Sequence, residues 1–262
     1  MNLRFIKYHG TGNDFILVDN RDASLDLTKH EIAHLCNRRF GIGADGLMLL
    51  NRHYEHDFEM KYFNSDGGEG SMCGNGGRCI AAFAKHLGIV SDPTKFLASD
   101  GVHKACHTEN GIELRMNDLS IAAQNGSELF LDSGSPHLVI FSDNIKDLDV
   151  ATRGRKIRYS DRFKPAGTNV NFVEYVDQNQ IFVRTYERGV EDETYSCGTG
   201  AVASSLAAVI RYKFSADSVT VKTIGGELLI KYKKQDSKDS FVFHDIWLCG
   251  PAKQVYSGTI EL

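Results

Sequence analysis

Apolar and polar residues alternate in short stretches along most of the chain, which is the pattern of strands that turn one face towards a core. Glycine, asparagine and aspartate separate these stretches, as they do in turns. So many short strands favour a fold dominated by sheet. In the first half of the chain we predict strands at 3–8, 15–19, 46–50, 58–63, 102–106 and 112–116. In the second half we predict them at 129–131, 137–141, 170–176, 181–186, 219–223, 228–232 and 241–247.

Three segments carry helix signals instead. Thr28 and Glu31 form a capping box, which predicts a helix from this point to about Arg38. Two alanine-rich segments open on glycine-rich stretches and predict helices at 74–86 and 198–212. The basic segment 153–158 is interrupted by Gly154 and Ile157, and we interpret it as a solvated surface loop.

Two cysteine motifs indicate that the halves of the sequence are copies of one unit. Residues 73–77 read CGNGG and residues 197–201 read CGTGA, a shift of 124 positions. Other segments correspond in the same order at shifts of 122 to 125 positions, and loop insertions produce such small drifts. These further correspondences are 12–15 with 134–137, 62–64 with 186–188, Glu69 with Glu193, and Gly101 with Gly226.

The repeat predicts an α+β fold of two pseudo-symmetric half-barrels. Each half is expected to be a mostly antiparallel sheet wrapped around its own alanine-rich helix. We place the N-terminal half at 1–117, with 251–262 returning to it as a closing strand, and the C-terminal half at 118–250. The two cysteine motifs would then face each other across a cleft between the halves, which is where we expect the active site.

Composition excludes several classes of protein. The chain has 262 residues and a formal net charge of −4, and its basic residues are scattered, so we expect no nucleic-acid partner. We find no long apolar run that would form a signal peptide or a membrane span, which favours a cytoplasmic protein. The six cysteines form no C-x-x-C pair, so we expect free thiols and no structural metal site.

Cys73 and Cys197 stand immediately before the two glycine-rich helix starts. Free backbone N–H groups and the positive end of the helix dipole lower a thiol pKa there and also bind carboxylates. If two such sites face each other, one thiolate can take a proton from Cα while the other thiol delivers a proton to the opposite face. This arrangement predicts stereochemical inversion beside a carboxylate, without a cofactor. We interpret the remaining cysteines, at 36, 79, 106 and 249, as small apolar residues.

Five motifs carry a resemblance to a known family, and together they span nearly the whole chain. They are HGTGNDF at 9–15, FNSDG at 63–67, CGNGGRC at 73–79, YERG at 186–189 and ETYSCGTG at 193–200. In these motifs the sequence resembles the diaminopimelate epimerase family. The resemblance implies an isomerase, homodimeric and cytoplasmic, that needs no pyridoxal phosphate. Its substrates would be LL- and meso-2,6-diaminopimelate, on the route to lysine and peptidoglycan precursors.

The resemblance also implies a role for each matching residue. Cys73 would be the proton donor and Cys197 the proton acceptor, while His137 and Glu187 would orient or tune the thiols. Arg188 would pair with the distal carboxylate of the substrate. The full set of residues implied to bind substrate is Asn13, Asn64, Gly74, Asn75, Asn169, Glu187, Arg188, Gly198 and Thr199.

Two positions depart from the family pattern. Ser135 stands where the family often has asparagine, and Gly46 where some members have glutamine.

Three other functions compete with the epimerase. A proline or hydroxyproline racemase would not need Arg188, because its substrate has one carboxylate. A carboxylate-binding protein would not need two thiols, and a thiol redox protein would act through a disulfide.

Overall fold

The computed structural model describes residues 2–70, 72–89, 91–122, 126–236 and 240–262. The chain divides into two compact units, residues 1–114 with 250–262 (unit 1) and residues 115–249 (unit 2). No helix in the described part of the chain is both long enough and apolar enough to cross a membrane.

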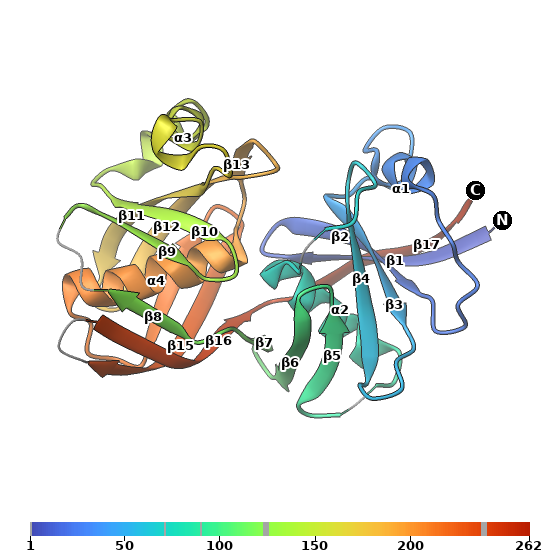
Figure 1. The fold of residues 1–262 in the computed structure, drawn as a ribbon. Helices are drawn as coiled ribbons and strands as arrows, with labels where there is room; N and C mark the ends of the chain where they lie inside the picture. The colour runs from blue at the N-terminus through green and yellow to red at the C-terminus, as the bar shows by residue number, and fades with distance from the viewer. Residues whose placement is uncertain (1, 71, 90, 123–125, 237–239) are drawn as a thin grey trace. The chain divides into compact units, whose positions relative to one another are not determined.

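Unit 1 is a sheet that surrounds one buried helix. The helix, α2, packs against strands β1, β2, β3 and β6 (Figure 1), and its buried residues are mostly small or apolar, with Asn75 and Arg78 among them. The elements of this unit, with the strand that reaches its boundary, are β1 (Asn2–Gly10), β2 (Asn13–Asp19), α1 (Lys29–Cys36), β3 (Gly46–Asn51), β4 (Phe58–Asn64), α2 (Gly74–His86), β5 (Thr94–Ala98), β6 (Gly101–Thr108), β7 (Gly111–Arg115) and β17 (Lys253–Glu261).

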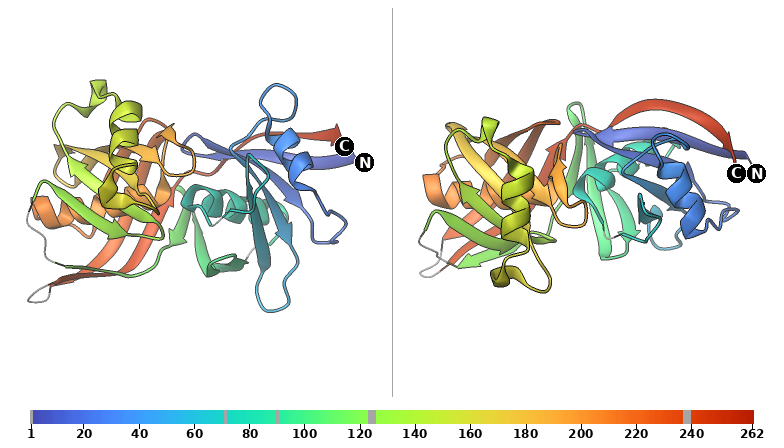
Figure 2. Two further views of the ribbon diagram at one scale, coloured as in Figure 1. Left: turned by 45° about the horizontal axis from the view of Figure 1, so that its top comes forward. Right: turned by 90° about the horizontal axis from the view of Figure 1, so that it is seen from above.

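The two ends of the chain lie side by side in unit 1. Strand β17 pairs antiparallel with β1 along almost its whole length, with Ile260 opposite Leu3 (Figures 1 and 2). Both side chains pack on the apolar core that also holds Ile16 and Leu47. The C-terminal strand therefore completes the sheet begun by the N-terminal one.

Unit 2 is built in the same way around helix α4. This helix packs against β9, β10, β11, β12, β14 and β15, and most of its residues are buried (Figure 1). The elements are β8 (Leu119–Ala122), β9 (Glu128–Asp132), β10 (Pro136–Phe141), η1 (Ile145–Asp147), α3 (Val150–Arg158), η2 (Asp161–Phe163), β11 (Asn169–Asp177), β12 (Gln180–Glu187), β13 (Asp192–Thr194), α4 (Gly198–Tyr212), β14 (Ser218–Thr223), β15 (Gly226–Asp236) and β16 (Ser240–Gly250).

The strands of the two units follow one pattern of pairing. In unit 1, β1–β2 is antiparallel, β2–β3 parallel, β3–β4 antiparallel, β4–β5 parallel and β5–β6 antiparallel. In unit 2, the pairs β9–β10, β10–β11, β11–β12, β12–β14 and β14–β15 repeat that sequence of directions. The predicted fold class, two pseudo-symmetric α+β halves each wrapped around a helix, is confirmed.

The strand register corrects one part of the predicted repeat. Phe15 pairs with Gly46 in unit 1, and His137 pairs with Asn169 in unit 2. One strand further on, Met48 pairs with Tyr62 and Asn171 pairs with Thr185. Tyr62 is therefore equivalent to Thr185 rather than to Tyr186, so the aligned segment 62–64 corresponds to 185–187. The sequence alignment matches Tyr62 with Tyr186, and this match places the segment one residue out of register.

The interpretation of 153–158 as a surface loop is wrong, because these residues belong to helix α3. Asp149 caps the helix, its side chain accepting from the Thr152 amide at 3.0 Å. Gly154 had suggested a break, but it is a packing residue: a Cβ there would stand 2.3 Å from Cβ of Tyr186. Arg153, Arg155 and Lys156 are exposed on this helix, whereas Arg158 is only 14% exposed and pairs with Glu191.

Other elements differ from prediction mainly at their ends. The capping box of Thr28 and Glu31 is present, but α1 ends at Cys36, and Asn37 is its C-cap. Both central helices have the predicted bounds. Strands β5, β8 and β13 were not predicted because each has only three to five residues, too few for alternation to register.

Candidate active site

Each unit places a cysteine at the start of its central helix with nearly the same backbone geometry. Cys73 is the N-cap of α2, with φ −109° and ψ 131°, and Cys197 is the N-cap of α4, with φ −112° and ψ 117°. Each cysteine carbonyl accepts the first helical hydrogen bond, from Gly77 at 2.7 Å and from Ala201 at 2.9 Å. Both thiols therefore lie at the positive end of a helix dipole.

Glycine is required at the third residue of each helix because another strand passes close by. A Cβ at Gly76 would stand 2.3 Å from Cε of Met48, and a Cβ at Gly200 would stand 2.5 Å from Oδ1 of Asn171. The Gly200 position also lies 3.3 Å from Sγ of Cys197. The glycine-rich motifs thus let the neighbouring strands approach the helix starts directly beneath the cysteines.

One partner of the Cys73 thiol is a hydrogen-bond acceptor. The thiol lies 3.6 Å from Oδ1 of Asn13, and Nδ2 of Asn75 donates to the same oxygen at 3.4 Å. Nδ2 of Asn13 donates to the carboxylate of Asp45 at 2.7 Å. Because a carboxylate only accepts, this bond fixes the amide so that its oxygen points at the sulfur.

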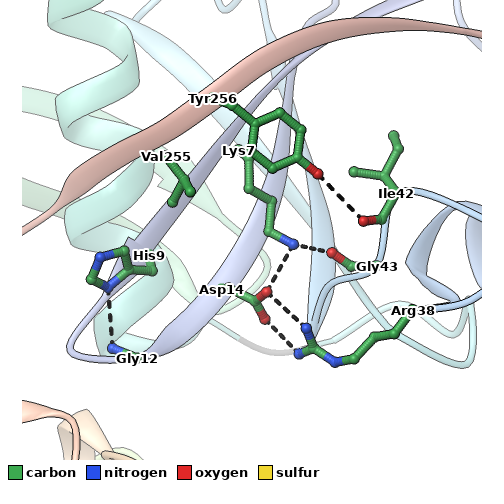
Figure 3. Close-up of a pocket in the computed structure, with 9 residues that line it drawn as sticks. All are labelled: Lys7, His9, Gly12, Asp14, Arg38, Ile42, Gly43, Val255 and Tyr256. Atoms are coloured by element: carbon green, nitrogen blue, oxygen red, sulfur yellow. Dashed lines mark hydrogen bonds and ion pairs between the residues drawn. The ribbon is translucent and has the colours of Figure 1, made fainter.

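A network of charges supports the turn that carries Asn13. Arg38 bonds to both Asp14 and Asp45 at 2.7 Å, and Lys7 pairs with Asp14 at 2.8 Å (Figure 3). Burial alone would raise the pKa of Asp14, but the hydrogen bonds from Arg38 and Lys7 outweigh it and hold that pKa at about 2. Asp14 is therefore ionised at neutral pH and anchors this turn.

A buried arginine stabilises the start of α2 through hydrogen bonds. Arg78 is 0 % exposed; it donates to the Gly74 carbonyl at 3.1 Å and to Oδ1 of Asn75 at 2.9 Å. It also donates to the hydroxyl of Thr11 at 3.4 Å. These bonds hold the Asn75 amide with its nitrogen towards Asn13, consistent with the orientation described above.

One partner of the Cys197 thiol is a hydroxyl. Oγ1 of Thr199 lies 3.5 Å from the sulfur and 2.9 Å from Nε2 of His137. Nδ1 of His137 in turn lies 3.0 Å from Nδ2 of Asn171. His137 therefore contacts the thiol through Thr199 rather than directly.

Burial keeps the His137 ring neutral. It lowers the pKa of this imidazole to about 3, and the nearby charge of Arg188 acts in the same direction. A neutral ring carries one proton, so one nitrogen donates and the other accepts. His137 is therefore not a reservoir of positive charge beside Cys197.

Arg188 is held over the end of strand β10. Its backbone amide donates to Oδ1 of Asn169 at 2.8 Å, and its guanidinium donates to Oγ of Ser135 at 3.4 Å and to the Ala166 carbonyl at 3.3 Å. Nδ2 of Asn169 also donates to Ser135, at 2.9 Å. Ser135, the departure from the family pattern, thus joins Asn169 and Arg188 into one group.

Glu191 clamps the loop that carries Glu187 and Arg188. Its carboxylate pairs with Arg158 at 2.8 Å and accepts from Tyr159 at 2.8 Å and from the Gly189 amide at 3.0 Å. Burial would raise the pKa of Glu191, but these donors, with Arg158 the strongest, lower it to about 2. Its backbone amide also bonds to the Glu187 carbonyl at 2.8 Å, so the loop is closed on itself.

The remaining expected site residues lie at strand ends. Asn64 ends β4, where its carbonyl accepts from the Gly67 amide at 2.9 Å, and its side chain is exposed. Glu187 ends β12 and accepts from the Thr194 hydroxyl at 3.0 Å. Gly46 starts β3, where a Cβ would stand 2.5 Å from the Phe63 carbonyl, so this departure has a steric reason.

Two other cysteines are buried and hard to ionise. Burial raises the pKa of both Cys36 and Cys79 to about 12. This agrees with their interpretation as small apolar residues. Among the residues that the structure describes, no group of three or more His, Cys, Asp or Glu side chains is placed to hold a metal ion.

Sequence reasoning missed four residues of these surroundings. Asn171 and Thr185 lie inside strands, where polar residues usually face solvent, and Asp45 and Glu191 lie in loops outside the aligned repeat segments. The strand register identifies the first two, because Asn171 and Thr185 occupy the positions that Met48 and Tyr62 occupy in unit 1.

Solved structures similar to this chain show the fold. A phenazine biosynthesis protein of the PhzF family from Bacillus anthracis matches with a TM-score of 0.72 at 14% identity, covering 100% of both chains. A hydroxyproline epimerase from Agrobacterium vitis, with bound trans-4-hydroxy-L-proline, matches with a TM-score of 0.66 at 13% identity, covering 99% of this chain and 92% of the other.

Similar sequences share a much higher identity with this chain than those structures do. The diaminopimelate epimerase of Flavobacterium psychrophilum is 46% identical, covering 98% of this chain and 100% of that protein. The diaminopimelate epimerase of Chlorobaculum tepidum is 43% identical, covering 97% and 99%. The family model for diaminopimelate epimerase matches residues 5–121 and 129–252. With both cysteine helix starts inside the matched segments, this chain belongs to the diaminopimelate epimerase family.

Proposed function

We propose that this protein interconverts LL- and meso-2,6-diaminopimelate by moving protons at Cα between two cysteines, in the biosynthesis of lysine and peptidoglycan precursors. Family membership supports the substrate. The observation that carries the chemistry is the matched pair of N-cap cysteines, Cys73 and Cys197, each at a glycine-rich helix start. The proposed reaction uses no cofactor.

The two helix starts would bind the carboxylate next to the reacting carbon. The amides of Gly74 and Asn75, and those of Gly198 and Thr199, belong to the first turns of α2 and α4, where backbone N–H groups have no partner within the helix. Negative charge grows on this carboxylate as Cα loses its proton. Amide donors aimed at it stabilise the carbanionic state more than the ground state, as in an oxyanion hole.

We assign Cys73 as the proton donor and Cys197 as the acceptor for the LL-to-meso direction. The Asn13 carbonyl oxygen, held towards Cys73 by Asp45, favours a protonated thiol that can donate to it. The neighbour of Cys197 is the Thr199 hydroxyl, which can donate to a thiolate. Cys197 then takes the Cα proton while Cys73 gives its proton to the opposite face, and the reverse reaction exchanges these roles.

The distal end of the substrate would select a dicarboxylate. Arg188, held by Asn169 and Ser135, offers a guanidinium to the distal carboxylate, and Glu187 offers a carboxylate to an ammonium group. Asn13 and Asn64 of unit 1 complete the proposed set of substrate contacts. His137 and Glu187 orient the groups next to the thiols, since a neutral His137 does not act as the base.

We also propose that the protein is a cytoplasmic homodimer. Strand β17 leaves the adjacent side chains of Val255 and Tyr256 exposed by 55% and 43%, and we propose that a second subunit covers this surface. Sedimentation of the wild type and of Tyr256→Ala checks this assembly. A monomer at all concentrations in the wild type would refute it.

The activity is tested by following solvent deuterium into Cα of LL-diaminopimelate by NMR, under reducing conditions. We expect label together with conversion to the meso form in the wild type, and loss of conversion in Cys73→Ala and in Cys197→Ala. Cys106→Ala is the matched control, because it removes a half-buried thiol that is not at a helix start.

No exchange in the wild type would refute the substrate, and proline and hydroxyproline would be tried next. Full activity in either single variant would refute the two-thiol mechanism itself.

A further inference from the structure

A line of buried polar side chains runs from strand β12 to the sulfur of Cys197. Thr185 is 4% exposed, and Asn171 and His137 are 0% exposed. The Thr185 hydroxyl bonds to Oδ1 of Asn171 at 3.0 Å, and Asn171 reaches His137, which reaches Thr199. A polar group is costly to bury without a hydrogen-bond partner, and each member of this chain has one. A complete buried chain of polar side chains needs an explanation.

The direction of each hydrogen bond from Thr185 as far as Thr199 is determined. Nδ2 of Asn171 donates to the carbonyl of Leu138 at 3.2 Å, and a backbone carbonyl only accepts, so the amide cannot be reversed. The same nitrogen therefore donates to Nδ1 of His137, and the single proton of the neutral ring lies on Nε2. Nε2 donates to Thr199, and the Thr199 hydroxyl can then turn its own proton to the sulfur of Cys197, 3.5 Å away.

The other unit shows that the fold does not require this chain. In unit 1 the positions equivalent to His137, Asn171 and Thr185 are Phe15, Met48 and Tyr62. There the rings of Phe15 and Tyr62 pack edge to face with centroids 6.0 Å apart. The same strands at the same register therefore pack with apolar and aromatic side chains in one unit and with a polar chain in the other.

We propose that Thr185 and Asn171 are positioning residues that orient His137 so that Thr199 donates a hydrogen bond to the sulfur of Cys197 and favours its thiolate. A hydrogen bond to the charged form lowers the pKa of an acid. The proposal gives the two cysteines of a symmetric fold different proton affinities. It rests on the proposed function for its purpose, although it concerns the protein before substrate binds.

The groups that face this chain come from every element packed around it. Thr199 and Gly200 belong to α4, Asn171 to β11 and Thr185 to β12, and none of these is charged. The loop after β12 contributes Arg188, whose positive charge acts on His137 and opposes its protonation. The proton that Cys197 takes from substrate therefore stays on the sulfur, ready for the reverse reaction, and does not pass to the imidazole.

The test measures the alkylation rate of each cysteine against pH. Iodoacetamide at limiting concentration is followed by peptide mass spectrometry from about pH 5 to about pH 10, because the thiolate is the reacting species. The informative variant is Thr185→Val, which keeps the side-chain shape and removes the hydroxyl. Thr185→Ser, which keeps the hydroxyl, is its matched control. Cys73 is the internal control in every sample.

We expect the pH midpoint of Cys197 to rise in Thr185→Val and to rise further in Asn171→Leu, with Thr185→Ser unchanged. A rise of about one pKa unit slows Cys197 alkylation about tenfold at neutral pH. The Cys73 midpoint should not move in any variant. Because a variant that folds poorly would alter both cysteines, this difference separates orientation from general damage.

An unchanged Cys197 midpoint in both Thr185→Val and Asn171→Leu, or a parallel shift of both cysteines, would overturn the proposal. Failure of the proposed function has a different signature. In that case the wild type would not exchange deuterium into diaminopimelate, while the alkylation midpoints would still differ between variants.

Discussion

Removing the Glu191 carboxylate tests whether the Arg188 loop is held in place for substrate. This side chain takes hydrogen bonds from Arg158, Tyr159 and the Gly189 amide, and the residue itself adopts a left-handed backbone with φ 62°. In Glu191→Ala the loop 187–191 loses these bonds at once, while the starts of α2 and α4 keep all of theirs.

The magnitude follows from the exposure of the pair. The Arg158 and Glu191 side chains are 14% and 28% exposed, so solvent screens the interaction only in part. Hydrogen bonds to charged groups contribute about 1.5–3 kcal/mol, and we expect Glu191→Ala to lower the free energy of unfolding by about 2 kcal/mol. If Arg188 loses one well-placed bond to the distal carboxylate, KM rises about tenfold. We expect kcat to change far less, since the Glu187 carboxylate keeps its hydrogen bond from the Thr194 hydroxyl.

The assay is steady-state epimerisation of LL-diaminopimelate together with thermal unfolding. The matched control is Glu193→Ala, which breaks a comparable pair: Glu193 bonds to Arg184 at 2.7 Å, with side chains 20% and 12% exposed. This control should lose similar stability without a rise in KM. A Glu191→Ala protein with wild-type KM, or an equal KM rise in both variants, would refute the reasoning.

Three further predictions concern other parts of the molecule. Asp14→Asn should lower the free energy of unfolding by about 2 kcal/mol at neutral pH. Because the folded pKa of about 2 lies below the usual 3.8, this contribution is complete above about pH 4.5 and fades as the pH falls towards 2. Denaturant titration at several pH values measures it. Ser135→Ala should raise KM about threefold with little effect on kcat, measured by the same epimerisation assay, because one long hydrogen bond of 3.4 Å from the Arg188 guanidinium is lost. Cys36 and Cys79, with pKa values of about 12, should react with iodoacetamide at neutral pH only after unfolding, as peptide mass spectrometry would show; modification in the native protein would contradict their burial.

The elements that position the cysteines could be predicted from the sequence, because their signals are local. Alanine and glycine content set the bounds of α2 and α4, and the capping box set the start of α1. The segment 153–158 failed for a non-local reason. Gly154 reads as a helix breaker until the ring of Tyr186 is seen to occupy the space that a side chain would need.

The surroundings of the cysteines were harder to predict than the cysteines themselves. In β11, the stretch from Asn169 to Val173 is buried on both faces, so alternation cannot show which side chains point towards α4. Asn171 looked like any polar strand residue, and its role depends on Thr185, fourteen positions away. Glu191 is similar, since its partner Arg158 lies 33 positions earlier on a helix that was not predicted.

The comparison of the two units separates what the fold needs from what the chemistry needs. Both units keep a cysteine N-cap and a glycine one turn from it, so these features serve the shared task of presenting a thiol beside backbone amides. Beneath the helices the units diverge, with Phe15 and Met48 in one and His137 and Asn171 in the other. A repeat that conserved everything would give both thiols the same proton affinity, and neither would be ready as the base while the other was ready as the acid. On the mechanism proposed above, the polar side chains of unit 2 supply the difference in proton affinity that a two-base inversion uses, at a depth where solvent cannot level it.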